Sequence, residues 1–175
     1  AEQVRHEVKR ARCIVPKDGQ LFAAVADSPL LTQGHPRLGF QGRHFNVDAY
    51  NRLRQDLHGT LLVPHDGLVE PLTTIKDARE ITCIERAARI ADKAFDRILK
   101  IMRPGMRELD VARELEYIML RLGSEGTAFT TICASGARSA LPHGDASKKR
   151  LEAGDFVTLD YGALVSGYCS DITRT

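Results

Sequence analysis

Two aspartates near the end of the chain, Asp160 and Asp171, have the residue type and spacing to bind a metal ion. They lie in the stretch 156–175, FVTLDYGALVSGYCSDITRT, whose β-branched and aromatic residues and Ser166-Gly167 turn signal predict an antiparallel β-hairpin. A tight turn there places the two carboxylates opposite or nearly opposite each other, about 5 Å apart, where like charges repel. A divalent cation between them removes this repulsion, because carboxylate oxygens suit hard or borderline metals.

The spacing of these aspartates also fits structural roles that need no metal. Both side chains could face solvent on an edge strand, or Asp160 could cap the turn that begins at Tyr161-Gly162. The residues alone leave the metal site and these two alternatives open.

A histidine lies in the preceding loop SGARSALPHGDASKK, residues 135–149, which is rich in Gly, Ser and Ala. His143 follows Pro142, which restricts φ, and precedes Gly144, which lets the backbone approach a neighbour closely. Binding residues often lie on such loops when a rigid scaffold holds them. His143 is therefore a candidate ligand contact, although a loop histidine without a role fits the same pattern.

Two helices are predicted before this loop. The first begins at Asp77, which forms a capping-box pattern with Glu80, and it stops before Pro104-Gly105. The second spans Glu108–Leu122. Apolar residues recur at three- and four-residue steps in both helices, so one face of each is expected to lie in a core. The run Thr127–Ala134 then has the composition of a strand.

The first seventy residues alternate short apolar runs with polar connections, which is typical of an α/β arrangement. Asn46 is a candidate N-cap for a helix over Val47–Leu57, and the Pro- and Gly-containing segment Pro64–Thr74 is interpreted as a linker. The candidate strands or short buried segments are Cys13–Val15, Leu21–Ala26, Arg37–Gly42 and Thr60–Val63.

Composition limits the class of protein. The 175 residues are 43% hydrophobic and carry a net charge of only +2, which favours neither a nucleic acid nor an anionic membrane as partner. No apolar run approaches a membrane span, and the polar start has no signal-peptide core, so either the protein is cytoplasmic or its true start is missing. Four cysteines without a C-x-x-C pair indicate free thiols in a reducing compartment.

Three phrases of the sequence resemble one enzyme family: SALPHG at 139–144, GDFVTLDYGA at 154–163 and GYCSDITRT at 167–175. They are similar to the pita-bread metallopeptidases of family M24, which include Xaa-Pro dipeptidase, aminopeptidase P and methionine aminopeptidase. The resemblance extends back through residues 75–95 and is nearest to the proline-specific branch.

The resemblance implies roles for four residues. Asp160 and Asp171 match the first two ligands of a dinuclear metal centre, and His143 matches a catalytic residue that contacts the substrate. Thr173, two residues beyond Asp171, is expected to orient a carboxylate or a water from outside the ligand set. Three further family ligands, a His and two Glu, come from later sequence that this chain does not contain. Mn²⁺ is the expected metal, with Co²⁺ or Zn²⁺ as alternatives.

The same resemblance implies a fold and an activity. The expected fold is α+β, with the first half of a pita-bread catalytic domain at 71–175 after part of a small α/β N-terminal domain at 1–70. The implied activity is metal-dependent hydrolysis of the bond between an N-terminal residue and proline, by a homodimer. The chain alone, with two of the five ligands, is expected to bind metal weakly and to hydrolyse peptides poorly. The alternative is a non-catalytic pita-bread domain that binds peptides or protein partners.

Overall fold

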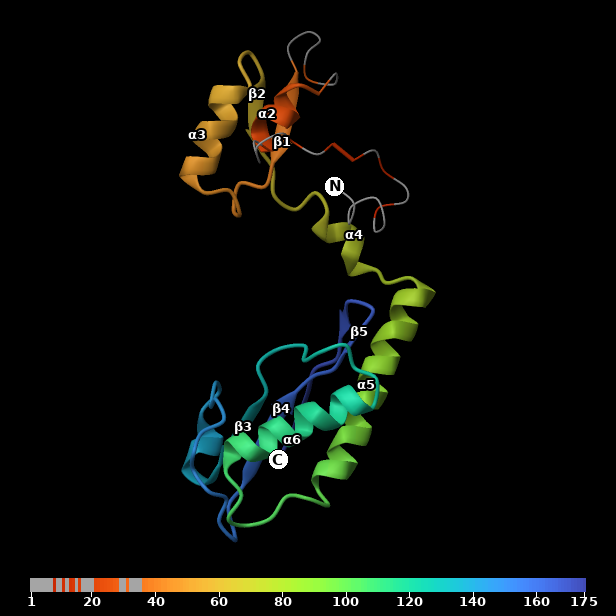
Figure 1. Ribbon diagram of the computed structural model, residues 1–175, viewed down its shortest axis with the longest axis vertical. Coiled ribbons are helices and arrows are strands. Elements are labelled where there is room, and N and C mark those ends of the chain that lie inside the picture. The colour runs from red at the N-terminus through yellow and green to blue at the C-terminus, as the bar shows by residue number, and fades with distance from the viewer. Residues whose placement is uncertain are drawn as a thin grey trace. The chain divides into compact units, whose positions relative to one another are not determined.

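The computed structural model describes residues 36–175 without a gap and, before them, residues 8, 11, 13, 14, 16, 21–28 and 31. The chain divides into two compact units, one ending at Thr74 and the other running from Ile75 to Thr175 (Figure 1). No helix among these described residues is long and apolar enough to cross a membrane.

The first unit contains a small parallel sheet. Its strands β1 (Arg37–Phe40) and β2 (Leu61–Pro64) pair in parallel and are joined by helix α3 (Val47–Asp56). The Asn46 side chain accepts a hydrogen bond of 2.8 Å from the first turn of α3, which confirms the predicted N-cap. Leu53 of α3 is buried, so this helix contributes to the small core of the unit.

Three expectations for this unit need correction or lie partly outside the described residues. Leu21–Ala26, expected as a strand or a short buried segment, forms helix α2 with no buried residue, and its three alanines explain the preference for a helix. The expected linker contains the short helix α4 (Glu70–Thr74). At Cys13–Val15, the described residues Cys13 and Ile14 lie in no strand, and Val15 falls outside the described residues.

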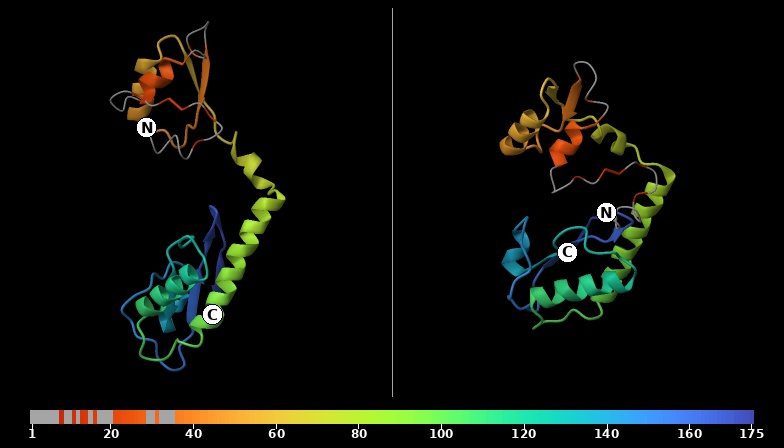
Figure 2. Two further views of the ribbon diagram at one scale, coloured as in Figure 1. Left: turned by 45° about the vertical axis from the view of Figure 1, so that its right-hand side comes forward. Right: turned by 45° about the horizontal axis from the view of Figure 1, so that its top comes forward.

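Two helices form one side of the second unit, α5 (Ala78–Ile98) and α6 (Glu108–Arg121). The capping box of α5 is present. The Asp77 carboxylate accepts a 2.8 Å hydrogen bond from the Glu80 amide, and the Glu80 carboxylate accepts a 2.7 Å hydrogen bond from the Asp77 amide. Both helices begin within one residue of the predicted positions. Figure 2 shows them beside the strands of the same unit.

Three antiparallel strands in the order β3-β4-β7 form the main sheet of the second unit. The expected strand at Thr127–Ala134 is shorter than predicted, because ladder pairing begins only at Ile132. A 3₁₀ helix, η2, follows β3. The bounds are β3 (Ile132–Ser135), η2 (Gly136–Ala140), β4 (Val157–Tyr161) and β7 (Ile172–Arg174).

The predicted hairpin is confirmed. Between β4 and β7, the strands β5 (Leu164–Val165) and β6 (Tyr168–Cys169) pair across the two-residue loop Ser166-Gly167. Both loop residues have positive φ, 51° and 81°, as a type I′ turn requires. The turn sets the register of both strand pairs, because Leu164 pairs with Cys169 and Asp160 pairs with Thr173.

The core of the second unit lies between the helices and one face of the sheet. Cys133, Leu159 and Tyr161 are almost completely buried there, and the Tyr161 hydroxyl donates a 3.2 Å hydrogen bond to the Ala91 carbonyl of α5. Side chains alternate across a strand, so Asp160, between Leu159 and Tyr161, points to the other face.

Candidate metal and substrate site

Asp160 lies in the middle of β4, between Ile132 on β3 and Thr173 on β7. Its Oδ1 atom is buried, and no protein donor reaches it within the part of the chain that the structure describes. The Thr131 Oγ1 atom is likewise buried without a hydrogen-bond partner among the described residues. A buried carboxylate oxygen without a partner is costly and calls for an explanation. A bound cation supplies one.

Asp171 precedes β7 and is exposed. Because Thr173 is the direct partner of Asp160, the continued register places Asp171 diagonally from Asp160 and level with Gly162. Diagonal neighbours have Cα atoms about 7–8 Å apart, and residues two apart in a strand share a face. Asp160 and Asp171 are therefore not direct partners in the ladder, and the close approach of their carboxylates stays a prediction.

Gly162 is a site-adjacent residue whose importance the sequence reasoning missed. A Cβ at this position would overlap the carbonyl oxygen of Ser170 and lie 2.9 Å from the Cβ of Ala128. Only glycine therefore allows the backbone before Asp171 to approach β4 this closely. A glycine within a strand pattern is the signal that could have indicated it.

His143 lies in the loop after η2 and is exposed. The loop runs along the edge of the sheet, because Asp145 forms an antiparallel bridge with Ile132, the same residue that pairs with Asp160. Asp145, Ile132 and Asp160 thus lie in one row across three neighbouring segments. Gly144 packs closely, since a Cβ there would lie 3.0 Å from that of Ala134.

Thr173, the direct partner of Asp160, is exposed on the same face. The hydroxyls of Thr158 and Thr175, two residues along β4 and β7 from Asp160 and Thr173, lie 3.2 Å apart. Sequence reasoning did not single out these last two residues. A face with a carboxylate and three hydroxyls can bind a cation or a polar substrate group.

The residues present fit part of a metal site. Within the described residues, no three His, Cys, Asp or Glu side chains lie close enough together to hold a metal ion. Asp160 and Asp171 provide the oxygen donors that divalent ions prefer. Because no third ligating side chain lies beside them among the described residues, a complete coordination shell needs further ligands.

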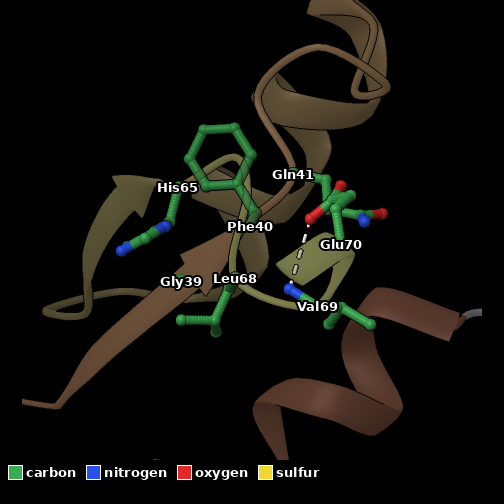
Figure 3. Close-up of a pocket in the computed structure, with 7 residues that line it drawn as sticks. All are labelled: Gly39, Phe40, Gln41, His65, Leu68, Val69 and Glu70. Carbon is green, nitrogen blue, oxygen red and sulfur yellow. Dashed lines mark hydrogen bonds between the residues drawn. The ribbon is translucent and has the colours of Figure 1, made fainter. Parts of the chain in front are cut away.

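The first unit has an open pocket of about 180 Å³, shown in Figure 3. Two of its polar side chains, those of Glu70 and His65, already interact with nearby backbone. The Glu70 carboxylate accepts a 3.2 Å hydrogen bond from the Val69 amide, and His65 Nδ1 lies 3.3 Å from the Asp66 carbonyl oxygen. The pocket shows no converging set of groups comparable to the sheet face around Asp160. Its lining consists of Gly39, Phe40, Gln41, His65, Leu68, Val69 and Glu70.

Known proteins resemble both the sequence and the structure. The model of metallopeptidase family M24 matches residues 82–175. An uncharacterized peptidase of Bacillus subtilis, YqhT, is 45% identical over 174 residues, covering 99% of this chain and 49% of the relative. The Xaa-Pro dipeptidase of Pyrococcus furiosus is 52% identical over 110 residues, covering 63% of this chain and 32% of that enzyme.

Two solved structures of proline-specific peptidases are similar to this chain in fold. The prolidase from Pyrococcus furiosus has a TM-score of 0.86 at 36% identity, covering 99% of this chain and 52% of that one. The Xaa-Pro dipeptidase from Bacillus anthracis has a TM-score of 0.77 at 47% identity, covering 79% of this chain and 39% of that one. The chain thus spans about half or less of these relatives. The expected α+β pita-bread fold is confirmed, and the chain belongs to metallopeptidase family M24.

Proposed function

We propose that the full-length protein is a metal-dependent peptidase that cleaves the bond between an N-terminal residue and proline, as an Xaa-Pro dipeptidase or Xaa-Pro aminopeptidase. One observation carries the proposal: among the described residues, no donor reaches the buried Oδ1 atom of Asp160, which lies on β4 next to the strand that directly follows Asp171. Relatives named Xaa-Pro dipeptidase support the choice of substrate.

In this proposal Asp160 and Asp171 hold two divalent ions together with ligands from the rest of the protein. Mn²⁺ fits carboxylate-rich ligation best, with Co²⁺ and Zn²⁺ as alternatives. When bound, such ions polarise the scissile carbonyl and lower the pKa of the attacking water. The two carboxylates contribute negative charge at a place where no donor from the described part of the chain reaches Asp160 Oδ1.

The remaining residues act on the substrate and on the ligands. His143, exposed on a loop beside β3, donates a hydrogen bond to the peptide group of a substrate with proline in second position. Thr173, directly across from Asp160, is expected to orient a carboxylate or a water of the metal site through its hydroxyl.

Three further features belong to the same proposal. The unit that ends at Thr74 belongs to a small N-terminal domain, and the unit from Ile75 belongs to the catalytic domain. The full-length protein acts as a homodimer, as the family resemblance implies. The free cysteines among the described residues support a reducing, cytoplasmic location.

The test compares dipeptides with and without proline in the second position. The full-length protein is freed of metal by a chelator and then assayed on an Xaa-Pro dipeptide and its Xaa-Ala counterpart, with and without Mn²⁺. We expect hydrolysis that depends on Mn²⁺ and favours the proline substrate by at least about tenfold. A folded protein that hydrolyses neither these dipeptides nor a longer peptide with proline in the second position, with Mn²⁺, Co²⁺ or Zn²⁺ added in turn, would contradict the proposal and favour a binding domain.

A further inference from the structure

Glu108, the first residue of α6, is a charged side chain in the interior of the second unit. It is 0% exposed, whereas acidic residues are almost never buried unless they are paired. Neither the family phrases nor the proposed metal ligands include it, so its position needs a separate explanation.

The two oxygens of the Glu108 carboxylate accept hydrogen bonds from two separate segments of the chain. Oε1 accepts hydrogen bonds from the amide and hydroxyl of Ser135, at 2.7 and 2.8 Å. Oε2 accepts hydrogen bonds from the amide and hydroxyl of Ser147, at 3.1 and 2.6 Å. Ser135 and Ser147 are the residues on either side of the loop 136–146, which carries His143. One buried carboxylate therefore fastens both ends of that loop.

A fifth hydrogen bond extends this hold into the loop itself. Arg138 Nε donates to Glu108 Oε2 at 3.2 Å, and Nη2 of the same guanidinium donates to the carbonyl of Asp145 at 2.6 Å. The Asp145 amide in turn donates to the carbonyl of His143 at 3.0 Å. A continuous path of hydrogen bonds thus connects Glu108 to the backbone of His143.

The protonation state suits this arrangement. Burial by itself raises the pKa of the Glu108 carboxyl, but the four hydrogen bonds from Ser147 and Ser135 outweigh it and hold the pKa below its usual value. Glu108 is therefore ionised at neutral pH and can only accept hydrogen bonds. Every donor that it binds belongs to the loop or to a residue at its ends.

We propose that Glu108 is a positioning residue for His143: it anchors both ends of the loop 136–146 and, through Arg138, its interior, and so sets where the His143 ring meets the substrate. This inference rests on the proposed peptidase function. Glu108 contacts no reacting atom, and its effect on the reaction passes through His143.

The first test is the Glu108→Gln variant of the full-length protein, which keeps the shape but replaces one acceptor oxygen by a donor. We expect kcat on an Xaa-Pro dipeptide to fall about tenfold to fiftyfold while KM and bound metal change less than threefold, as for residues that orient a functional group. Asp110→Asn is the matched control, because Asp110 lies in the same helical turn but forms a partly exposed pair with Arg107. It should stay within about twofold of wild type.

A double-mutant cycle separates positioning from general destabilisation. If Glu108 acts through His143, the change Glu108→Gln should lower kcat less than about twofold when His143 is already alanine. A full tenfold loss in that background would show that Glu108 acts elsewhere and would overturn the inference. If the glutamine variant does not fold, Ser147→Ala, which removes one of the donors, takes its place with an expected threefold to tenfold loss.

Hydrogen exchange gives a readout that needs no activity. Amides in residues 136–146 should exchange at least about tenfold faster in Glu108→Gln, while the middle of α5 keeps its protection. Unchanged exchange in the loop contradicts the anchoring role. A wild-type protein that lacks Xaa-Pro hydrolysis contradicts the proposed function instead, and the exchange experiment still reports whether Glu108 holds the loop.

Discussion

The two faces of the β3-β4-β7 sheet differ in how completely their side chains are satisfied. On the helix-facing side, Leu159 and Tyr161 are buried, and the Tyr161 hydroxyl has a hydrogen-bond acceptor in α5. On the other side, between these two residues, Asp160 has a buried oxygen that no donor among the residues described by the structure reaches. Within β4, Leu159 and Tyr161 thus pack in the core, whereas Asp160 between them is available to bind a ligand.

This difference shows how a strand can carry function without losing its place in the fold. Strand alternation separates the residues that stabilise from those that bind, so burial of Leu159 and Tyr161 holds the backbone of Asp160 in position. An uncompensated carboxylate is tolerable on the open face because the core face supplies the stability. Mutations on the two faces should therefore affect different measurements.

The largest expected effect is on the open face. Asp160→Asn in the full-length protein should lower kcat/KM on an Xaa-Pro dipeptide by about 1,000-fold, because it removes a charged ligand oxygen. The thermal stabilisation by Mn²⁺ should disappear as well, while stability without metal changes by less than about 1 kcal/mol, since no donor in the described residues loses its partner at Oδ1.

The control for charge alone is Asp145→Asn, an exposed carboxylate in the same row of the sheet. It should retain activity within about threefold. Equal losses in the two variants would show that the face acts through its overall negative charge rather than through a ligand at Asp160.

The adjacent core residue should give the opposite pattern. Leu159→Ala should lower the free energy of unfolding by about 3 kcal/mol, because it leaves a cavity beneath the helices. Activity at low temperature, where the variant is still folded, should fall much less than in Asp160→Asn. Urea unfolding measures the loss, and Phe156→Ala, at a side chain that is 75% exposed, should cost less than about 0.5 kcal/mol.

The core face should also make stability sensitive to alkaline pH. Burial raises the pKa of Cys133 from its usual 9.0 to about 12, and burial likewise raises the pKa of Tyr161 from 10.0 to about 12. As pH rises, both groups lose their protons in the unfolded chain at a lower pH than in the folded protein. The stability that the two protonated groups contribute is therefore fully present below about pH 9 and is lost as pH rises toward 12. We expect the free energy of unfolding to be about 2 kcal/mol lower at pH 10 than at pH 8.

Urea titrations at the two pH values measure this loss. Cys133→Ala should reduce it by more than half, whereas Cys169→Ala, at an exposed position, should leave it unchanged. An identical pH dependence in all three proteins would mean that other groups control alkaline unfolding.

The smallest expected effect is at Thr173 on the open face. Thr173→Val keeps the shape but removes the hydroxyl opposite Asp160, and kcat/KM should fall about tenfold with unchanged unfolding. Thr173→Ser restores the hydroxyl and should recover most of the activity. Failure of serine to recover it would argue that the methyl group, and not the hydroxyl, matters at this position.

The elements near the site were largely predictable from local signals. The Asp77 capping box, the helical stripe of α6 and the Ser166-Gly167 turn depend on neighbours within a few residues, and all three are confirmed. Leu21–Ala26 was predicted incorrectly, because a six-residue apolar run fits either a buried strand or a short helix.

The sequence by itself determined helices α3, α5 and α6, the hairpin turn and the family phrases that single out His143, Asp160 and Asp171. These depend on short-range backbone preferences and on residue types, which are readable along the chain.

Only the tertiary structure decided which residues face one another. It placed Thr173 rather than Asp171 directly opposite Asp160, and it left no room for a side chain at Gly162. It also brought Glu108 to Ser135 and Ser147, which lie 27 and 39 residues further along. Register and burial arise from contacts between distant segments, and local sequence carries little information about such contacts.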